Sequence, residues 1–295
     1  MRYKYRVAVI DPYVLNNDGT WTPPVAPVHR EADYDSNGFD WLRTMQTRHF
    51  WYRGRHRFLL HFTRKTARSL SRAGRQPEAV DLGGGCGGWV RYLSEHAASD
   101  FHAIALADSS RTALRLAAGE IPPNTRRYQI DLLNLQWSAR WDVAFLLDVL
   151  EHIDEDAVVL EEIRRAVKPG GYLIVTTPAL EALRTAVDDM THHVRRYSRA
   201  DLDRLANRTG WQLVISRYFM FFLSPLLWLA RLSGPDVATM TRTDIRNYLD
   251  RTHRTPAGPI NAALSAIFAA ETPLGAWLPF PWGTSVLAVL RRPQD

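Results

Sequence analysis

A glycine-rich turn near residue 80 joins a short apolar run to a helical pattern. Residues 79–82 predict a buried strand, and residues 89–97 predict the helix that follows it. Between them, five glycines stand at positions 83, 84, 85, 87 and 88. Glycine permits positive φ angles and lets a ligand approach the main chain, so this unit predicts a nucleotide-binding loop in an α/β fold. The turn also satisfies the dinucleotide pattern G-x-G-x-x-G, so the turn alone does not identify the nucleotide.

Short apolar runs alternate with amphipathic helical patterns after this turn, which indicates crossover connections and a mostly parallel sheet. Strands are predicted at residues 79–82, 101–107, 127–130, 141–147, 172–176, 211–219 and 285–290. Helices are predicted at residues 89–97, from a cap at Ser109 or Ser110 to 117, at 157–167 before a turn at Lys168-Pro169-Gly170-Gly171, and at 198–210. The pattern therefore predicts a sheet of seven strands.

Acidic residues accompany four of the predicted strands. Asp108, Asp131 and Asp148 stand at strand ends, and Asp81 lies inside the first strand. The carboxyl ends of parallel strands meet at one edge, where open α/β sheets bind ligands, and an acid after the second strand can accept hydrogen bonds from both ribose hydroxyls. Any one of these acids could instead cap a helix or a turn. As a set, they predict one ligand cleft.

Five sequence blocks resemble the class I S-adenosylmethionine-dependent methyltransferases: residues 81–87, 108–109, 129–132, 145–153 and 173–178. The resemblance implies an α/β, Rossmann-like fold with a seven-stranded sheet, mostly parallel with an antiparallel last strand, and helices on both faces. An N-terminal helical or irregular extension and a C-terminal helical insertion would flank this core. It also implies an enzyme with S-adenosyl-L-methionine as cofactor.

The resemblance also implies which residues contact the cofactor. The glycines and Asp81 would face the methionyl part, Asp108 would hold the ribose, Asp131 would flank the adenine, and Asp148 would line the wall near the sulfonium. The full set implied for the core is Asp81, Gly83, Gly84, Gly85, Asp108, Ser109, Asp131, Leu132, Leu147 and Asp148.

Residues 35–60 resemble, more loosely, the N-terminal helix of a group of bacterial small-molecule methyltransferases. This likeness implies that Trp51 or Tyr52 packs at the cofactor and that Arg55 pairs with the methionine carboxylate, a pairing that suits guanidinium geometry. The interleaved basic and aromatic residues of this stretch could also form a nucleic-acid surface, although a solvated face of an amphipathic helix is the favoured interpretation.

Residues 188–197 resemble the segment that meets the acceptor in the same group. A histidine there could take the proton of an acceptor hydroxyl, because imidazole is partly neutral near pH 7. His193 is the first candidate and His192 the second. Two alternatives stay open: the segment could only fix the loop through His193, Arg196 and Tyr197, or proximity alone could suffice for transfer. His152 could line the same cleft, but its position at a helix start favours a structural role.

Composition limits the partners that the chain could bind. Cys86 is the only cysteine of 295 residues, which excludes an internal disulfide and a multi-cysteine zinc site. We expect no metal and interpret Cys86 as a small filler of the loop.

Only three of the 37 basic residues are lysines, and the net charge of +6 comes from scattered arginines, so no nucleic acid is expected. No stretch reaches the roughly 18 apolar residues of a membrane span and no signal peptide is evident, which favours a cytoplasmic protein.

The apolar run 218–232 could form a core helix, a lid, a dimer surface or a peripheral membrane contact, with core or lid packing as the default. The expected parts are an N-terminal extension and cap helix (1–76), the cofactor-binding core (77–220), a helical lid or insertion (221–280) and the last strand (281–295). The expected activity is methyl transfer to a small organic acceptor of natural-product, sugar or lipid type, with O-methylation slightly favoured. A scaffold without catalysis, a nucleic-acid methyltransferase and a nicotinamide-dependent oxidoreductase are the alternatives.

Overall fold

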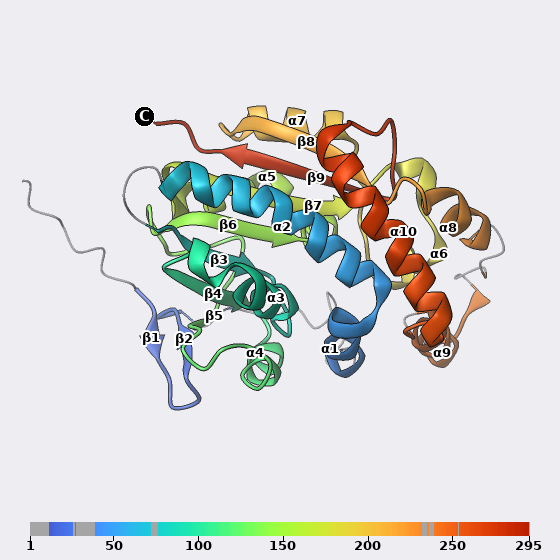
Figure 1. Ribbon diagram of the computed structural model, residues 1–295. Helices are drawn as coiled ribbons and strands as arrows, with labels where there is room; N and C mark the ends of the chain where they lie inside the picture. Colours follow the sequence, from blue (N-terminus) through green and yellow to red (C-terminus); the bar gives the residue numbers. More distant parts are fainter. Residues whose placement is uncertain are drawn as a thin grey trace, which may run out of the picture.

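The computed structural model describes residues 12–25, 27, 39–71, 76–231, 235, 239–252 and 254–294 (Figure 1). Its centre is a nine-stranded sheet with the order β1-β2-β5-β4-β3-β6-β7-β9-β8. Seven of these strands, all except β1 and β2, correspond to the predicted ones. They are β3 (Glu78–Leu82), β4 (Ala103–Asp108), β5 (Arg127–Gln129), β6 (Trp141–Leu147), β7 (Val167–Pro178), β8 (Gln212–Phe219) and β9 (Ser285–Arg291).

The prediction of seven strands is wrong, because a hairpin near the N-terminus adds two strands to one edge. β1 (Val14–Leu15) pairs antiparallel with β2 (Thr20–Thr22), and β2 pairs in parallel with β5. Arg127 of β5 secures the hairpin by donating to the backbone oxygen of Asp18 at 3.0 Å. Strands of two or three residues are too short to show an alternating pattern. The predicted helix start at Asp35 lies outside the described residues.

Strands β3 to β7 run parallel, and β9 lies antiparallel between β7 and β8, as predicted for the last strand. Alternating side chains cover the two faces of the sheet. Val80 and Leu82 belong to the core on the face that packs against α5 and α7. Ala79 and Phe145 belong to the opposite core, which includes side chains of α2, α3 and α10. The sheet is therefore buried on both faces, as parallel sheets usually are.

Helices surround this sheet (Figure 1). Their bounds are α1 (Phe39–Arg48), α2 (Phe50–Ser71), α3 (Gly88–Ala97), α4 (Arg111–Ala117), α5 (Asp156–Ala166), α6 (Ala186–Met190), α7 (Arg199–Arg208), α8 (Ser224–Arg231), α9 (Arg242–Thr252) and α10 (Gly258–Trp277), with 3-10 turns η2 (Ala98–Asp100), η3 (Leu150–His152) and η4 (Glu181–Leu183). Figure 1 shows α1, α6, α8 and α9 at the end of the molecule toward which β6 and β7 point.

The N-terminal helix predicted for residues 35–60 consists of two helices that meet at His49. Asn261 of α10 stabilises this break, because its side chain accepts from the backbone N–H of Phe50 and donates to the carbonyl of Arg48, both at 2.9 Å. Nδ1 of His49 accepts from the backbone N–H of Trp51 at 3.2 Å. Side chains thus satisfy backbone groups that a helix end leaves unpaired.

The turn predicted at residues 168–171 belongs to β7. Helix α5 ends at Ala166, and the pairing of β7 with β6 shifts between Trp141 and Val143, so these four residues bulge within the strand. The backbone N–H of Gly170 donates to the carbonyl of Arg292 at 3.0 Å, and the backbone N–H of Arg292 donates to the carbonyl of Gly171 at 2.9 Å. The residues that were expected to separate helix and strand therefore continue the sheet.

The apolar run 218–232 divides into a buried part and an exposed part. Residues 218–220 and Leu223 are buried, in agreement with core packing. Trp228 of α8, however, is 47% exposed, and Trp277 at the end of α10 is 78% exposed; residue 232 lies outside the described part. Among the described residues, no helix is long and apolar enough to cross a membrane.

Candidate functional site

The ends of five parallel strands meet at one edge of the sheet. Leu82 of β3 lies between Ala107 of β4 and Leu146 of β6. Asp108 pairs with Gln129 of β5, and Leu147 with Thr176 of β7. The acids that the sequence places at these strand ends are therefore neighbours along one edge.

The glycine loop between β3 and α3 leaves no room for side chains. Gly83 and Gly85 adopt φ angles of 70° and 55°, which disfavour other residues. A Cβ atom on Gly83 would lie 2.7 Å from Cγ2 of Val149, and one on Gly84 only 2.4 Å from the Asp81 carboxylate. The loop backbone therefore lies close to β3 and to Val149, which follows β6.

Asp108 connects the glycine loop to the start of α4. Its Oδ2 accepts from the backbone N–H of Gly85, and its Oδ1 from that of Ser110, both at 2.8 Å. Ser110 caps α4 by accepting from Ala113 at 3.3 Å, so it, and not Ser109, is the helix cap. Each carboxylate oxygen has two lone pairs, so these contacts are compatible with further bonds to ligand hydroxyls.

Asp81 is a buried acid beside the glycine loop. The residue is 1% exposed, and its Oδ1 has no hydrogen-bond partner within the described part of the chain. Burial raises the pKa of Asp81 to about 8, the Arg55 guanidinium opposes this shift, and the Asp108 carboxylate adds to it. A buried carboxyl oxygen without a partner is costly unless a ligand satisfies it. The site therefore fits a ligand that carries an amino group, as the methionyl part of S-adenosylmethionine does.

Helix α2 contributes Trp51, Tyr52 and Arg55 to the same edge. The buried Arg55 guanidinium lies 4.8 Å from the Trp51 ring centroid and 5.0 Å from that of Tyr52. It forms an ion pair with Asp148, whose φ of 56° is unusual for a residue other than glycine. Thr176 also holds Asp148, through its carbonyl at 2.8 Å and its hydroxyl at 3.2 Å. In this structure Arg55 thus has a protein partner, and its predicted pairing with the methionine carboxylate stays a prediction.

The predicted adenine contacts lie in the turn after β5. Oδ1 of Asp131 accepts from the backbone N–H of Leu133 at 2.9 Å, which stabilises the turn. Leu132 is half-buried and packs against the core, and Leu147 is buried at the end of β6. These side chains border the same edge, but no contact of theirs assigns a role.

His193 is held in place by a buried carboxylate. Nδ1 of His193 lies 2.8 Å from Oδ1 of Asp188, which also accepts from Nε of Arg196 at 2.8 Å. Burial alone would raise the pKa of Asp188, but the hydrogen bonds from His193 and Arg196 lower it below its usual range. An ionised carboxylate only accepts, so Nδ1 carries a hydrogen, and in the neutral imidazole the lone pair lies on Nε2. His192 is exposed with a φ of 58°.

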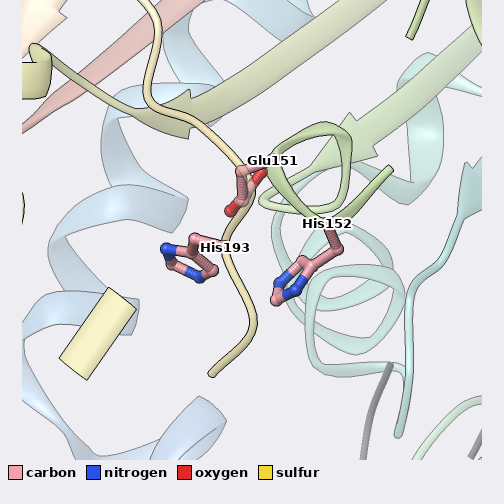
Figure 2. A group of neighbouring side chains, drawn as sticks. All are labelled: Glu151, His152 and His193. Atoms are coloured by element: carbon pink, nitrogen blue, oxygen red, sulfur yellow. The ribbon is translucent and has the colours of Figure 1, made fainter. Parts of the chain in front are cut away.

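Glu151 and His152 join His193 in one cluster (Figure 2). Both follow β6 in the turn η3, and the backbone N–H of Val194 donates to the Glu151 carbonyl at 2.8 Å, which holds the His193 segment against this turn. Burial raises the pKa of Glu151 well above its usual value and lowers that of His152 to about 3. Sequence reasoning missed Glu151 as a site residue and gave His152 a structural role. The sequence contained one signal of this cluster, the adjacent Glu151 and His152 after β6. Their proximity to His193 is a tertiary contact, which the sequence pattern does not show.

The chain matches a known family over more than half of its length. The methyltransferase domain family matches residues 44–216. No curated protein sequence matches the chain.

Solved structures share the fold at low sequence identity. One is from a complex between the Haloferax volcanii Trm112 methyltransferase activator and a protein described as a methyltransferase, with 16% identity, a TM-score of 0.56 and coverage of 90% of this chain and 99% of that chain. Another is described as a sarcosine dimethylglycine methyltransferase from Galdieria sulphuraria, with 16% identity, a TM-score of 0.50 and coverage of 80% and 86%. With the family match and the strand-edge site, the chain belongs to the methyltransferase domain family and is a class I S-adenosylmethionine-dependent methyltransferase.

Proposed function

We propose that this methyltransferase acts on a small organic acceptor and that a hydroxyl oxygen is the favoured methyl-accepting atom. The observation that carries the proposal is the orientation of His193 by Asp188, with a hydrogen bond of 2.8 Å. This bond keeps the Nε2 lone pair of His193 available to accept a proton. The charges of Asp148 and Arg55 act on Glu151 in the same cluster, which supports a position near the cofactor edge.

The residues at the strand edge have distinct proposed roles in binding. Asp108 accepts from the ribose hydroxyls, while Asp81 receives the amino group of the methionyl part beside the glycine loop. Asp131 and Leu132 flank the adenine. Trp51 and Tyr52 cover the site from α2, and Arg55 exchanges Asp148 for the methionine carboxylate. When bound, the cofactor supplies an electrophilic methyl carbon attached to a sulfonium.

His193 acts as general base in this proposal. The acceptor oxygen bonds the methyl carbon as the carbon–sulfur bond breaks, and the hydroxyl proton passes to Nε2 of His193. Asp188 stabilises the imidazolium that forms, through the bond to Nδ1. His192, the second candidate, is exposed, whereas Asp188 holds the ring of His193, so His193 is the stronger candidate.

Replacing His193 by Gln tests the base. We expect kcat on a hydroxylated acceptor to fall by about 100-fold, within the range of general acid–base contributions, and the acidic limb of the pH–rate profile to disappear. His192→Asn is the matched control, because asparagine tolerates positive φ, and it should keep both kcat and the profile. A variant that loses thermal stability but keeps the wild-type pH profile would show that His193 only fixes the loop.

Activity on a panel of acceptors separates the alternative functions. It should include hydroxylated aromatic metabolites, sugars and lipids, with methyl release measured as formation of S-adenosylhomocysteine. Tight cofactor binding without release on any acceptor would instead favour a non-catalytic scaffold. Methylation of RNA or DNA in preference to all small acceptors would favour a nucleic-acid methyltransferase.

A further inference from the structure

We propose that Glu151, His152 and His193 bind a divalent transition-metal ion. The three side chains face a common space (Figure 2), and one donor atom from each lies within 4.8 Å of the other two. Metal bonds of about 2.1 Å place tetrahedral donors about 3.4 Å apart, so small side-chain rotations would close the site around an ion.

The cluster contains buried polar atoms that lack partners. Glu151 is 1% exposed, and its Oε2 has no hydrogen-bond partner among the residues that the structure describes. Nδ1 of His152 is also buried, and no described residue gives it a hydrogen bond. Leaving such atoms unsatisfied lowers stability, and more so when the group is charged. An ion in the common space would give both atoms a partner at once.

The surroundings of the cluster resemble the support of a metal ligand. His193 donates from Nδ1 to Asp188, and Arg196 holds both oxygens of that carboxylate at 2.8 and 3.0 Å. A histidine that binds metal through one nitrogen usually donates from the other to a carboxylate or carbonyl, which fixes the ring and increases its basicity. The His152 and His193 rings are nearly perpendicular, at 83°, with centroids 4.7 Å apart. Two imidazoles in this arrangement can direct nitrogens to one ion without stacking.

The donor set indicates the class of metal. Two imidazoles and one carboxylate suit zinc, iron or cobalt ions, while magnesium and calcium prefer oxygen ligands. The lack of a multi-cysteine motif excludes a thiolate zinc site only, so it does not argue against this one. Three protein ligands leave coordination positions open, as in catalytic metal sites. The inference rests on the proposed function for its acceptor, but a His193 that binds the ion through Nε2 cannot also be the base. An acceptor oxygen would instead occupy an open position, where the ion would lower its pKa and aid loss of its proton to water.

Zinc titration of the chelator-treated full chain tests the site. We expect isothermal titration calorimetry to show one Zn²⁺ per chain, and Co²⁺ to produce visible absorption bands that Zn²⁺ removes. Glu151→Gln and His152→Ala should each weaken Zn²⁺ binding by about 100-fold or more, since each loses a direct ligand. The controls are Glu155→Gln and His192→Asn, two exposed neighbours in the sequence, which should bind as the wild type does.

Two outcomes would overturn the site: no stoichiometric Zn²⁺ binding by the wild type, or unchanged affinity in a Glu151→Gln protein with wild-type circular dichroism. Asp108→Ala separates this proposal from the methyltransferase assignment, because it should bind Zn²⁺ normally. Activity of the metal-free protein distinguishes the two roles of His193. If hydroxyl methylation needs added Zn²⁺, His193 acts as a ligand; full activity without metal would argue against a catalytic ion and favour the base alone.

Discussion

At the scale of single residues, the site brings together side chains from distant parts of the chain. Asp108 and Asp148 follow strands whose apolar runs are evident in the sequence, and parallel strands bring such ends together. Glu151 and His193 are 42 positions apart in the chain. Their proximity depends on a backbone hydrogen bond from Val194, which no local pattern encodes. The sequence therefore indicated the candidate base and His152 as a possible part of the same cleft, but not Glu151.

Asp108→Ala provides the residue-scale prediction. We expect the dissociation constant for S-adenosylhomocysteine to rise by about 100-fold, because hydrogen bonds to a charged acceptor contribute about 1.5–3 kcal/mol each. Calorimetry measures this change, and thermal unfolding checks the loss of the bonds to Gly85 and Ser110. Asp203→Ala, on the exposed face of α7, is the control and should bind normally. Intact binding by Asp108→Ala would remove Asp108 from the cofactor site.

At the scale of elements, the core strands were predicted close to their observed positions, while elements that depend on distant partners differed. β6 matches the prediction at both ends, because its seven residues are all buried. The break at His49 was not predicted, since it is stabilised by Asn261, a residue 211 positions from Phe50. Helix α2 also packs closely along α10. Phe268 of α10 lies where a side chain on Gly54 would project.

Gly54→Ala tests this helix contact. A Cβ on Gly54 would lie 1.9 Å from Cδ1 of the buried Phe268, so α2 and α10 would have to separate. We expect the free energy of unfolding to fall by about 1–3 kcal/mol from overpacking, reduced by the helix preference of alanine over glycine of about 1 kcal/mol. Denaturant unfolding measures the change. Gly258→Ala, where nothing lies within 4 Å, should be neutral or slightly stabilising. Equal stability of the two variants would contradict the close contact.

At the scale of the whole molecule, burial shifts the pKa values of ionisable groups in the sheet and in the helices that cover it in opposite directions. Burial raises the pKa of Asp81 to about 8 and also raises that of Glu271, whereas it lowers the pKa of His56 well below its usual value. His56 therefore costs stability as the pH falls below about 6.5, where the unfolded chain takes up a proton that the folded protein does not. Asp81 and Glu271, whose pKa values burial raises, instead lower the free energy of unfolding as the pH rises. The net charge of +6 does not predict these opposing effects on stability.

Asp81 should control stability between pH 7 and 8 in the cofactor-free protein. Its usual pKa of about 3.9 applies to the unfolded chain, so across this range the folded protein retains a proton that the unfolded chain has released. The free energy of unfolding should therefore fall as the pH rises toward 8, by at most about 1.4 kcal/mol per pH unit, and level off above it. Denaturant unfolding at several pH values measures this slope.

The comparison with Asp81→Asn isolates this carboxyl group, because all other titrating groups are common to both proteins. We expect the stability of Asp81→Asn relative to the wild type to increase from pH 7 to pH 9, since asparagine has no charge to desolvate. Asp203→Asn, on an exposed helix face, should follow the wild-type curve at every pH. Parallel curves for Asp81→Asn and the wild type would mean that Asp81 is already ionised at pH 7. If it is protonated, binding of S-adenosylhomocysteine should release a proton as its amino group meets Asp81, so the affinity should rise as the pH increases toward 8.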